Sequence, residues 1–287
     1  MNRVRLGVAQ LASVVASADA DPRPANLEAA MRAIRVLAAE GAQIVVFGEC
    51  FLTGYMSGRS AARHAIGESI HDQYVARLAV AAADHDVHIV MGAVTDKGPY
   101  PGSVYNSALL IGPHELVGVY NKVHLATVET EAGVAAIERA WFAPGSSLPV
   151  FGTPHGVLGL EICYDVFFPE SARTLAMQGA ELIINLSAPY TDPANEERWD
   201  HLLYARAMEN SVPYLHASIV GDQGDASFFG GSRLVGPTGA TLAEAPRHEE
   251  ALVVMELDRT LIRAARTELN PFANRRPEIY SPSLDHR

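Results

Sequence analysis

The chain has 287 residues, of which 48% are hydrophobic and 19% charged, so it can bury a substantial core without disulfides or a structural metal. Its 22 basic and 33 acidic residues give a net charge of −11, which argues against sequence-independent nucleic-acid binding and against docking on an anionic membrane. No apolar run is long enough for a signal peptide or a membrane-spanning helix. We therefore expect a cytoplasmic protein whose two cysteines, Cys50 and Cys163, are free thiols.

The first half of the chain alternates between predicted strands and predicted helices. Residues 42–49, AQIVVFGE, form a continuous apolar run typical of a strand that is buried on both faces. Residues 24–41 have apolar positions at helical spacing and end at a glycine, which predicts a helix. The other predicted elements are a strand over 4–11, a helix over Ser69–Asp84, a strand over 87–94 and a hairpin over 105–122.

The second half repeats this alternation after a long connection. Residues 123–149 show no clear period, and connections of that length are usually functional or contain short helices. No linker, charge run or shift in composition divides the chain, so we predict one α/β domain over residues 1–287 with mixed sheets. The predicted elements are strands over 156–163, 181–188, 213–220 and 251–258, helices after Pro169 and over Asn195–Asn210, a flexible glycine-rich loop over 221–232, and a hairpin over 232–245.

Three of the apolar strands stop at a reactive side chain. Glu49 ends IVVFGE, Lys122 ends LVGVYNK, and Cys163 ends VLGLEIC. Because ligands meet α/β proteins at the ends of strands, we expect the three side chains to converge. Convergence would also explain why Cys163 lies between two carboxylates, Glu161 and Asp165, which disfavour the reactive thiolate. The ammonium group of Lys122 would then supply the missing positive charge.

Such a trio is suited to nucleophilic catalysis. Glu49 would accept the thiol proton, the sulfur of Cys163 would attack a carbonyl or nitrile carbon, and Lys122 would face the charge that develops on the attacked heteroatom. The backbone N–H of Tyr164 is a second candidate donor to that charge, and a donor of this kind is typically worth about 3–4 kcal/mol. The apolar surroundings of Glu49 would raise its pKa toward neutrality, as a base requires.

Five segments of the chain carry motifs that extend over nearly its whole length: VVFGECFLTGY, YNKVHL, GLEICYDVFFPESARTLAMQGAELIINLSA, GGSRLVGPTG and RRPEIYSPSL. They resemble the nitrilase superfamily, the carbon–nitrogen hydrolases that use a Glu-Lys-Cys triad. The first motif departs from the family, because Gly48 stands where proline is common. The resemblance implies a four-layer α-β-β-α sandwich with two mixed sheets, whose outer helices associate into homodimers or larger homo-oligomers.

The resemblance gives the three strand-end residues the roles inferred above. It also implies a second glutamate, shortly before a Pro-Gly pair in the long connection. We assign this position to Glu138, rather than to Glu129 or Glu131, because Glu138 keeps the offset to Phe142-Ala143-Pro144-Gly145. Its expected role is to hold Lys122 or the nitrogen end of the substrate.

The residues after the nucleophile bear on the substrate. Cys163-Tyr164-Asp165 resembles the amidase side of the family rather than the nitrilase side. We therefore predict an amidase that cleaves a small carboxamide to acid and ammonia through a cysteine thioester. An N-carbamoyl amidohydrolase and a nitrilase remain alternatives with the same triad, and a binding protein with a silent site is a third.

The pocket walls are expected at the loops that follow strands. The loop over Asn185–Pro193 follows the strand next to Cys163, so Ala188 and Tyr190 are predicted to bind substrate. Phe228 and Phe229 are expected to close the site. No arginine stands out as a carboxylate clamp, although Arg173 and Arg233 are possible.

The remaining polar and sulfur-containing residues receive structural roles. Cys50 is expected to be a core thiol that points away from Glu49, because side chains alternate along a strand. His85 and His88 lack a third ligand in the sequence, so we predict neither a metal nor a cofactor. Asp165 and Glu170 are expected to organise the turn into the following helix.

Overall fold

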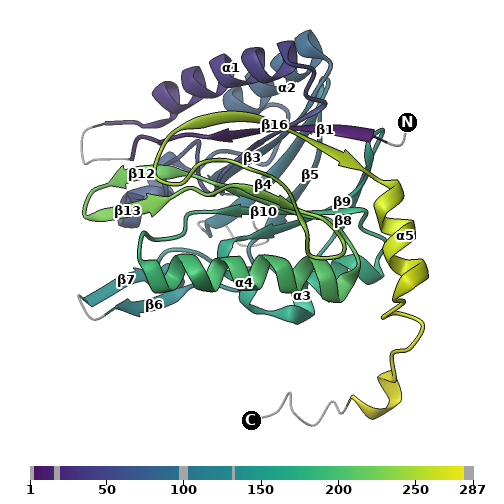
Figure 1. Cartoon of the computed structure of the whole chain (residues 1–287). Helices are drawn as coiled ribbons and strands as arrows, with labels where there is room; N and C mark the ends of the chain where they lie inside the picture. Colours follow the sequence, from purple (N-terminus) through teal and green to yellow (C-terminus); the bar gives the residue numbers. More distant parts are fainter. Residues whose placement is uncertain (1–2, 16–19, 97–102, 131–132, 281–287) are drawn as a thin grey trace.

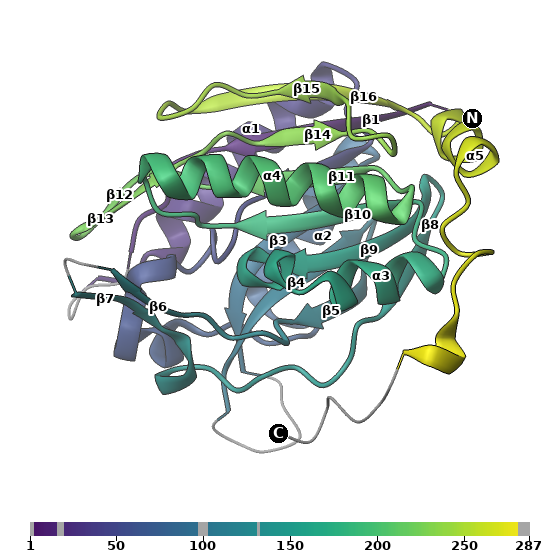
Figure 2. The same ribbon diagram turned by 60° about the horizontal axis from the view of Figure 1, so that its bottom comes forward.

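Four layers make up the fold, as Figure 1 shows. The computed structural model describes residues 3–15, 20–96, 103–130 and 133–280. Two six-stranded mixed sheets lie face to face. Helices α1 and α2 cover the outer face of one sheet, and α3 and α4 cover the outer face of the other (Figures 1 and 2). The predicted α-β-β-α sandwich is thus confirmed.

The first sheet has the strand order β16-β1-β2-β3-β4-β5. Strands β1, β2 and β3 run parallel, and the other neighbours pair antiparallel. The last strand of the chain therefore lies beside the first. The bounds are β1 (Arg3–Gln10), β2 (Ile44–Phe47), β3 (His88–Thr95), β4 (Tyr105–Gly112), β5 (Glu115–Asn121) and β16 (Ala251–Asp258).

The second sheet has the order β15-β14-β11-β10-β9-β8 and repeats the pattern of the first. Its parallel core is β9, β10 and β11, and antiparallel strands flank this core on both sides. Each sheet thus presents the carboxyl ends of parallel strands at one edge, where loops can carry functional groups. The bounds are β8 (Val150–Thr153), β9 (Gly156–Ile162), β10 (Leu182–Ser187), β11 (Tyr214–Ser218), β14 (Arg233–Val235) and β15 (Thr241–Glu244).

Alternating side chains explain why the strands read as continuous apolar runs. In β2, Ile44 and Val46 face the second sheet and join the cluster between the sheets. Val45 and Phe47 face the other way and pack with the cluster under α1 and α2. Both faces of the strand are therefore buried, as the sequence predicted.

Helices α1 to α4 begin where the sequence offers a cap or a proline, whereas α5 begins with neither. Asp72 caps α2, because its carboxylate accepts hydrogen bonds from the backbone of Tyr74 and Val75, so this helix begins later than predicted, after Asp72. In the described residues no helix has both the length and the apolar character needed to cross a bilayer. The α-helices are α1 (Arg23–Ala39), α2 (Gln73–His85), α3 (Pro169–Met177), α4 (Pro193–Asn210) and α5 (Thr260–Glu268); short 3₁₀ helices are η1 (Tyr55–His64), η2 (Glu138–Ala140), η3 (Cys163–Phe167) and η4 (Pro277–Ile279).

Two hairpins project at the same end of the sandwich (Figures 1 and 2). One lies in the long connection and consists of β6 (Thr127–Thr130) and β7 (Gly133–Ile137). The other consists of β12 (Val220–Gln223) and β13 (Ala226–Phe229). The prediction of a flexible loop over 221–232 is therefore wrong. The buried amide of Gln223 accepts hydrogen bonds from the backbone of η1, at Tyr55 and Met56, which anchors the second hairpin.

Candidate active site

The structure brings the side chains of Glu49, Lys122 and Glu138 together. The ammonium nitrogen of Lys122 lies 2.8 Å from Oε1 of Glu49 and 2.8 Å from Oε1 of Glu138. The side chains of Lys122 and Glu49 are fully buried, and Glu138 is nearly so. Among the acidic residues weighed for this place, Glu131 and the side chain of Glu129 lie outside the described part of the chain.

Cys163 is tied to Glu49 through the segment that follows β10. The backbone N–H of Ala188 donates to the sulfur of Cys163. The carbonyl of the preceding residue, Ser187, accepts a hydrogen bond of 3.4 Å from the backbone N–H of Glu49. Ser187, the last residue of β10, therefore holds the loop that carries Glu49 from the first sheet. Its neighbour Ala188 holds the thiol of Cys163.

Cys163 adopts an uncommon backbone conformation at this junction. Its φ is +45°, in the left-handed region that few non-glycine residues occupy, and it begins η3 directly after β9. Strain of this kind concentrates at functional sites, where it aims a side chain. Cys163 keeps 8% of its surface exposed, whereas Glu49 and Lys122 keep none. Among these three residues, Cys163 is thus the one that meets the pocket.

Close backbone contact explains the departure from the family motif before Glu49. A Cβ atom on Gly48 would lie 2.5 Å from the backbone nitrogen of Ile219 in the opposite sheet. A Cβ atom on Gly92 of β3 would lie 2.1 Å from the carbonyl oxygen of Gly48. Only glycine fits at both places, because the loop carrying Glu49 is packed between two backbones.

The electrostatics of the cluster favour a neutral thiol beside a basic carboxylate. Burial raises the pKa of Cys163 well above its ordinary value, and the charge of Glu49 raises it further, while Lys122 acts in the opposite direction. Burial also raises the pKa of Glu49, against the lowering effect of Lys122. Burial disfavours the ammonium of Lys122, but Glu138 and Glu49 outweigh it and hold its pKa well above the ordinary value. Lys122 therefore stays charged.

One oxygen of Glu49 is available for proton transfer. Its Oε1 accepts from Lys122 and, at 2.7 Å, from the side-chain amide of Asn106. Its Oε2 is buried and has no hydrogen-bond partner among the described residues. A buried carboxylate oxygen without a partner is costly, so this atom is poised to accept a proton.

Two members of the cluster were missed by the sequence reasoning. The amide of Asn106 donates to Glu49 and, at 3.3 Å, to Glu138, and the hydroxyl of Tyr55 donates to Glu138 at 3.2 Å. The sequence shows two adjacent polar residues, Asn106 and Ser107, near the start of a predicted strand, but it does not show which of them faces the cluster. In the structure the carbonyl of Asn106 also accepts from the backbone N–H of Lys122. Glu138 is also held by its own backbone segment, because its Oε2 accepts from the N–H of Ala126 at 2.6 Å.

Cys50 lies in the apolar cluster under α1 and α2 and is fully buried. Its thiol also donates to the side-chain oxygen of Asn106 at 3.3 Å. The core position matches the sequence-based expectation, and the contact adds a link to the polar cluster that the sequence did not indicate.

Asp165 organises the turn that follows the nucleophile. Its carboxylate accepts from the backbone of Ile162 at 2.8 Å, from the hydroxyl of Tyr120 at 2.6 Å and from the backbone of His124 at 3.1 Å. Tyr164 is the second residue of η3, where backbone N–H groups have no acceptor within the helix. The fixed turn thus leaves a donor close to the sulfur. Glu170 lies exposed in the first turn of α3.

A pocket of about 640 Å³ opens at Cys163, and Ala188 and Tyr190 line it as predicted. Phe228 is buried behind the lining, stacked on Tyr190 and edge-on to Tyr55. Phe229 packs under Arg247. Neither phenylalanine lines the pocket, so the expectation that both close the site is wrong; Phe228 instead supports two rings that do line it. The lining residues are Tyr55, Ala126, Thr127, Cys163, Tyr164, Phe167, Ala188, Pro189, Tyr190, Asp192, Asn195, Arg198 and Trp199.

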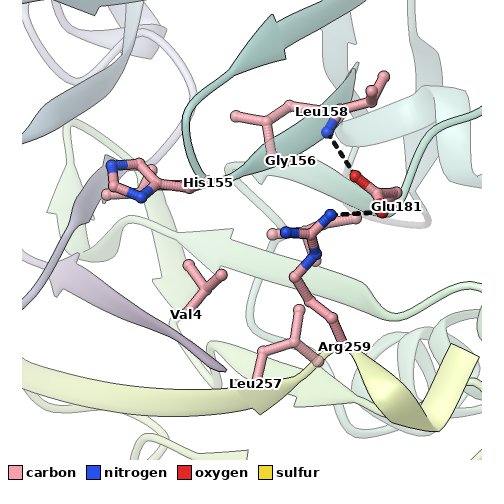
Figure 3. Close-up of a pocket in the computed structure, with 10 residues that line it drawn as sticks. Val4, His155, Gly156, Leu158, Glu181, Leu257 and Arg259 are labelled. Atoms are coloured by element: carbon pink, nitrogen blue, oxygen red, sulfur yellow. Dashed lines mark hydrogen bonds and ion pairs between the residues drawn. The ribbon is translucent and has the colours of Figure 1, made fainter. Parts of the chain in front are cut away.

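A second pocket, shown in Figure 3, is too small to hold a substrate. Its volume is about 10 Å³, which is room for one water molecule. Glu181 in its wall is committed to Arg259 at 2.5 Å and to the backbone of Val157 at 3.0 Å. His155 packs edge-on against His88, with ring centres 5.3 Å apart. In the described parts of the chain no three His, Cys, Asp or Glu side chains lie close enough to hold a metal ion.

A buried Glu-Lys-Glu cluster thus lies beside a cysteine at the strand ends of an α-β-β-α sandwich, an arrangement suited to nucleophilic catalysis. The family model described as "Carbon-nitrogen hydrolase" matches residues 5–267. The chain therefore belongs to the carbon–nitrogen hydrolase family, and it is an enzyme of that family.

Relatives described as nitrilases and amidases match most of the chain. A nitrilase of Pyrococcus abyssi is 35% identical over 262 residues, which are 89% of this chain and 92% of the relative. The omega-amidase of Homo sapiens is 30% identical over 267 residues, 90% of this chain and 92% of the relative. The solved structure of a variant amidase from Nesterenkonia sp. AN1 superposes with a TM-score of 0.79 at 27% identity, covering 96% of this chain and 94% of that one. That structure shows the acetamide moiety of fluoroacetamide covalently added to the active-site cysteine.

Proposed function

We propose that the protein is an amidase that hydrolyses a small carboxamide to its acid and ammonia through a thioester on Cys163. The proposal rests mainly on two neighbouring residues, Ser187 and Ala188, which hold the loop of Glu49 and the thiol of Cys163. Lys122 forms an ion pair with the carboxylate of the same Glu49. Relatives described as amidases lend support, including one with a covalently modified cysteine.

In the first half of the reaction the enzyme is acylated. Oε2 of Glu49 accepts the thiol proton while the sulfur of Cys163 attacks the amide carbon, and the electron pair of the C=O bond moves to oxygen. The N–H of Tyr164 and the ammonium of Lys122 stabilise this oxyanion. When the oxyanion collapses, the C–N bond breaks and the leaving nitrogen takes the proton from Glu49. Ammonia departs, and the acyl group stays on sulfur.

In the second half, water takes the place of ammonia. Glu49 accepts a proton from the water while the oxygen of the water attacks the thioester carbon. The second oxyanion uses the same donors, and its collapse breaks the C–S bond and returns the proton to the sulfur. Glu138 and Asn106 keep Lys122 and Glu49 in place throughout, because both residues are hydrogen-bonded to the pair.

Intact-mass spectrometry after incubation with paired amides, N-carbamoyl amines and nitriles tests the proposal. We expect an acyl adduct that maps to Cys163, not to Cys50, together with release of ammonia from the amides, and no adduct or turnover in Cys163→Ala. Faster turnover of nitriles or of N-carbamoyl amines would assign one of the alternative activities. A folded protein that forms no adduct and turns over no member of the panel would identify a silent site.

We also propose that the protein acts in the cytoplasm as a homodimer or larger homo-oligomer. Large apolar side chains on the ends of α3 and α4 and on the C-terminal segment support association through the outer helices. They are Met177, Met208, Leu269, Ile279 and Tyr280, all half or more exposed. Light scattering coupled to size exclusion tests the assembly, and we expect Met208→Glu to shift it toward the monomer.

A further inference from the structure

The pocket at Cys163 is lined by two groups of aromatic rings. One group comes from η3 and α4: the ring centres of Tyr164 and Phe167 are 5.1 Å apart, and those of Phe167 and Trp199 are 6.2 Å apart. The other group consists of Tyr55 and Tyr190, which share the buried ring of Phe228 as their support. Each group is held by its own ring contacts and so forms a stable apolar wall.

The charged side chains of the described lining lie at the rim. They are Asp192 and Arg198, both exposed, of opposite sign, and both at the start of α4. Asp192 is occupied in capping that helix, where it accepts from the backbone of Asn195 at 2.9 Å. Arg198 is thus the cation of the described lining, and its exposed guanidinium donates to the side-chain oxygen of Asn195 at 3.5 Å.

The two arginines that the sequence left as candidate clamps are committed elsewhere. Arg233 binds Asp200 at 2.8 Å and the hydroxyl of Tyr204 at 2.8 Å, and Arg173 donates to the carbonyl of Glu209 at 2.6 Å. Neither lines the pocket. An acyl group ending in a carboxylate would thus lose its hydration against the aromatic walls, and an ion pair with the water-exposed Arg198 would offset little of that cost.

We propose, on the basis of the amidase function above, that the site takes carboxamides whose acyl group is uncharged and apolar, with room for an aromatic ring. A volume of about 640 Å³ is far larger than a two- or three-carbon acyl group needs, and it falls within the usual range of ligand pockets. Rings of the substrate and of Phe167 and Trp199 can pack edge to face or offset, in the same manner as the rings within the wall.

The ratio of kcat/KM values for three amides tests the proposal: 3-phenylpropanamide, propionamide and succinamate. We expect the phenyl compound to be the best substrate and to exceed succinamate by about 100-fold or more, since an unpaired buried charge is rejected more strongly than a missing methylene. A preference for succinamate, or loss of its turnover in Arg198→Gln, would overturn the proposal.

Substitutions in the aromatic walls test whether these rings cause the preference for the phenyl compound. Phe167→Ala should lower the ratio of the phenyl compound to propionamide by about tenfold. Tyr190→Ala tests the opposite wall in the same way, in case Phe167→Ala does not fold. The matched control is Phe272→Ala, a partly buried phenylalanine that packs with Arg173 and Arg266 away from the pocket, and it should leave the ratio unchanged. An unchanged ratio in both wall variants would contradict the proposal.

The outcomes separate this inference from the function on which it rests. Turnover of propionamide with an adduct on Cys163, but without aromatic preference, would overturn only the substrate class. Absence of any adduct with every amide would overturn the amidase function itself.

Discussion

Asn106 lies at the centre of the buried polar cluster, although it has no reactive group of its own. Its amide nitrogen donates to both glutamates, and its amide oxygen accepts from the thiol of Cys50, which fixes the direction in which the amide points. Burial raises the pKa of Glu49, and the hydrogen bonds from Lys122 and Asn106 lower it again. Asn106 therefore helps to keep the base ionised.

Asn106→Leu should raise the pKa of Glu49, because it removes one of the donors to the carboxylate. Since the base acts in its ionised form, the acidic limb of the profile of kcat/KM against pH should move to higher pH. Activity at neutral pH should fall about 10- to 100-fold, because a hydrogen bond to a charged group is worth about 1.5–3 kcal/mol. The control is Asn210→Leu, which removes a buried amide that bonds the carbonyl of Arg206. An equal shift of the limb in both variants would refute the role of Asn106.

Cys50→Ala should retain most of the activity, whereas Cys163→Ala should retain none. The Cys50 thiol touches Asn106 but no reacting atom, so its loss should cost about 1 kcal/mol of stability and little turnover. Steady-state kinetics combined with urea unfolding separates the two effects. Loss of turnover in Cys50→Ala at unchanged stability would show that Cys50 takes part in the chemistry.

The convergence of Glu49, Lys122 and Cys163 could be predicted from sequence because each residue stands at the end of an apolar strand. Asn106 and Tyr55 could not, because their roles depend on which face of a strand or turn meets Lys122 and Glu138. That face is set by pairing between β4 and β5, and by the contact of η1 with the second hairpin. A single strand does not reveal its register, since a shift of one residue reverses every side chain.

Among the elements, α2 shows that the N-cap residue sets where a helix begins. The side chain of Asp72 accepts from two backbone groups of the first turn and from the backbone of Gly67 at 3.0 Å. The predicted helix begins at Ser69, and serine, like aspartate, caps helices well. The structure instead places the cap at Asp72, which is fixed by its bonds to the first turn and to Gly67 in the preceding loop.

Asp72→Ala should destabilise the protein by about 1 kcal/mol, the typical value for loss of an N-cap. The midpoint of urea unfolding measures the change. Asp84→Ala, at an exposed position near the end of the same helix, removes the same carboxylate without a cap and should change the midpoint much less. Equal effects of the two variants would mean that charge, not capping, accounts for the loss.

The hairpins and α5 show why other elements escaped prediction. The second hairpin is rich in glycine and polar residues, yet its strands pair from Val220–Phe229 to Gln223–Ala226, and tertiary contacts stabilise it. In α5 only Ile262 and Ala265 are buried, so nine residues carry too weak a period to be recognised. Both elements depend on what packs against them, which no local pattern encodes.

The free energy of unfolding of the whole protein depends on pH through buried histidines, above all His216. His216 is almost fully buried against Trp199, and burial lowers its pKa to about 3, with a further contribution from Arg233. The unfolded chain binds this proton below about pH 6.5, whereas the folded protein does not until about pH 3. Protons are therefore taken up on unfolding, and stability falls as the pH is lowered through that window.

His216→Gln should flatten this dependence. The wild-type protein should lose up to about 1.4 kcal/mol per pH unit from this residue between about pH 6 and pH 4, and the variant should lose less. Urea unfolding at a series of pH values gives the slopes. His71→Gln, at an exposed histidine, is the control, and a slope that is the same in wild type and both variants would refute the assignment.

At this largest scale the alternation of strands and helices predicted an α/β fold with mixed sheets, and the family resemblance implied the four layers, but neither predicted the partner of each strand. Strand β1 pairs with β2 on one side and, across the full length of the chain, with β16 on the other. Contacts so distant in sequence leave no trace in local periodicity.

The pairing of β1 with β16 has a consequence for biosynthesis. A nascent chain exposes the eight-residue outer edge of β1 until residues 251–258 have been made, and the register from Arg3–Asp258 to Gln10–Ala251 can close only then. An unpaired apolar edge invites association with other chains. Chain terminations before residue 251 should therefore yield aggregates rather than a smaller soluble enzyme, and assistance by chaperones should matter most while synthesis nears its end.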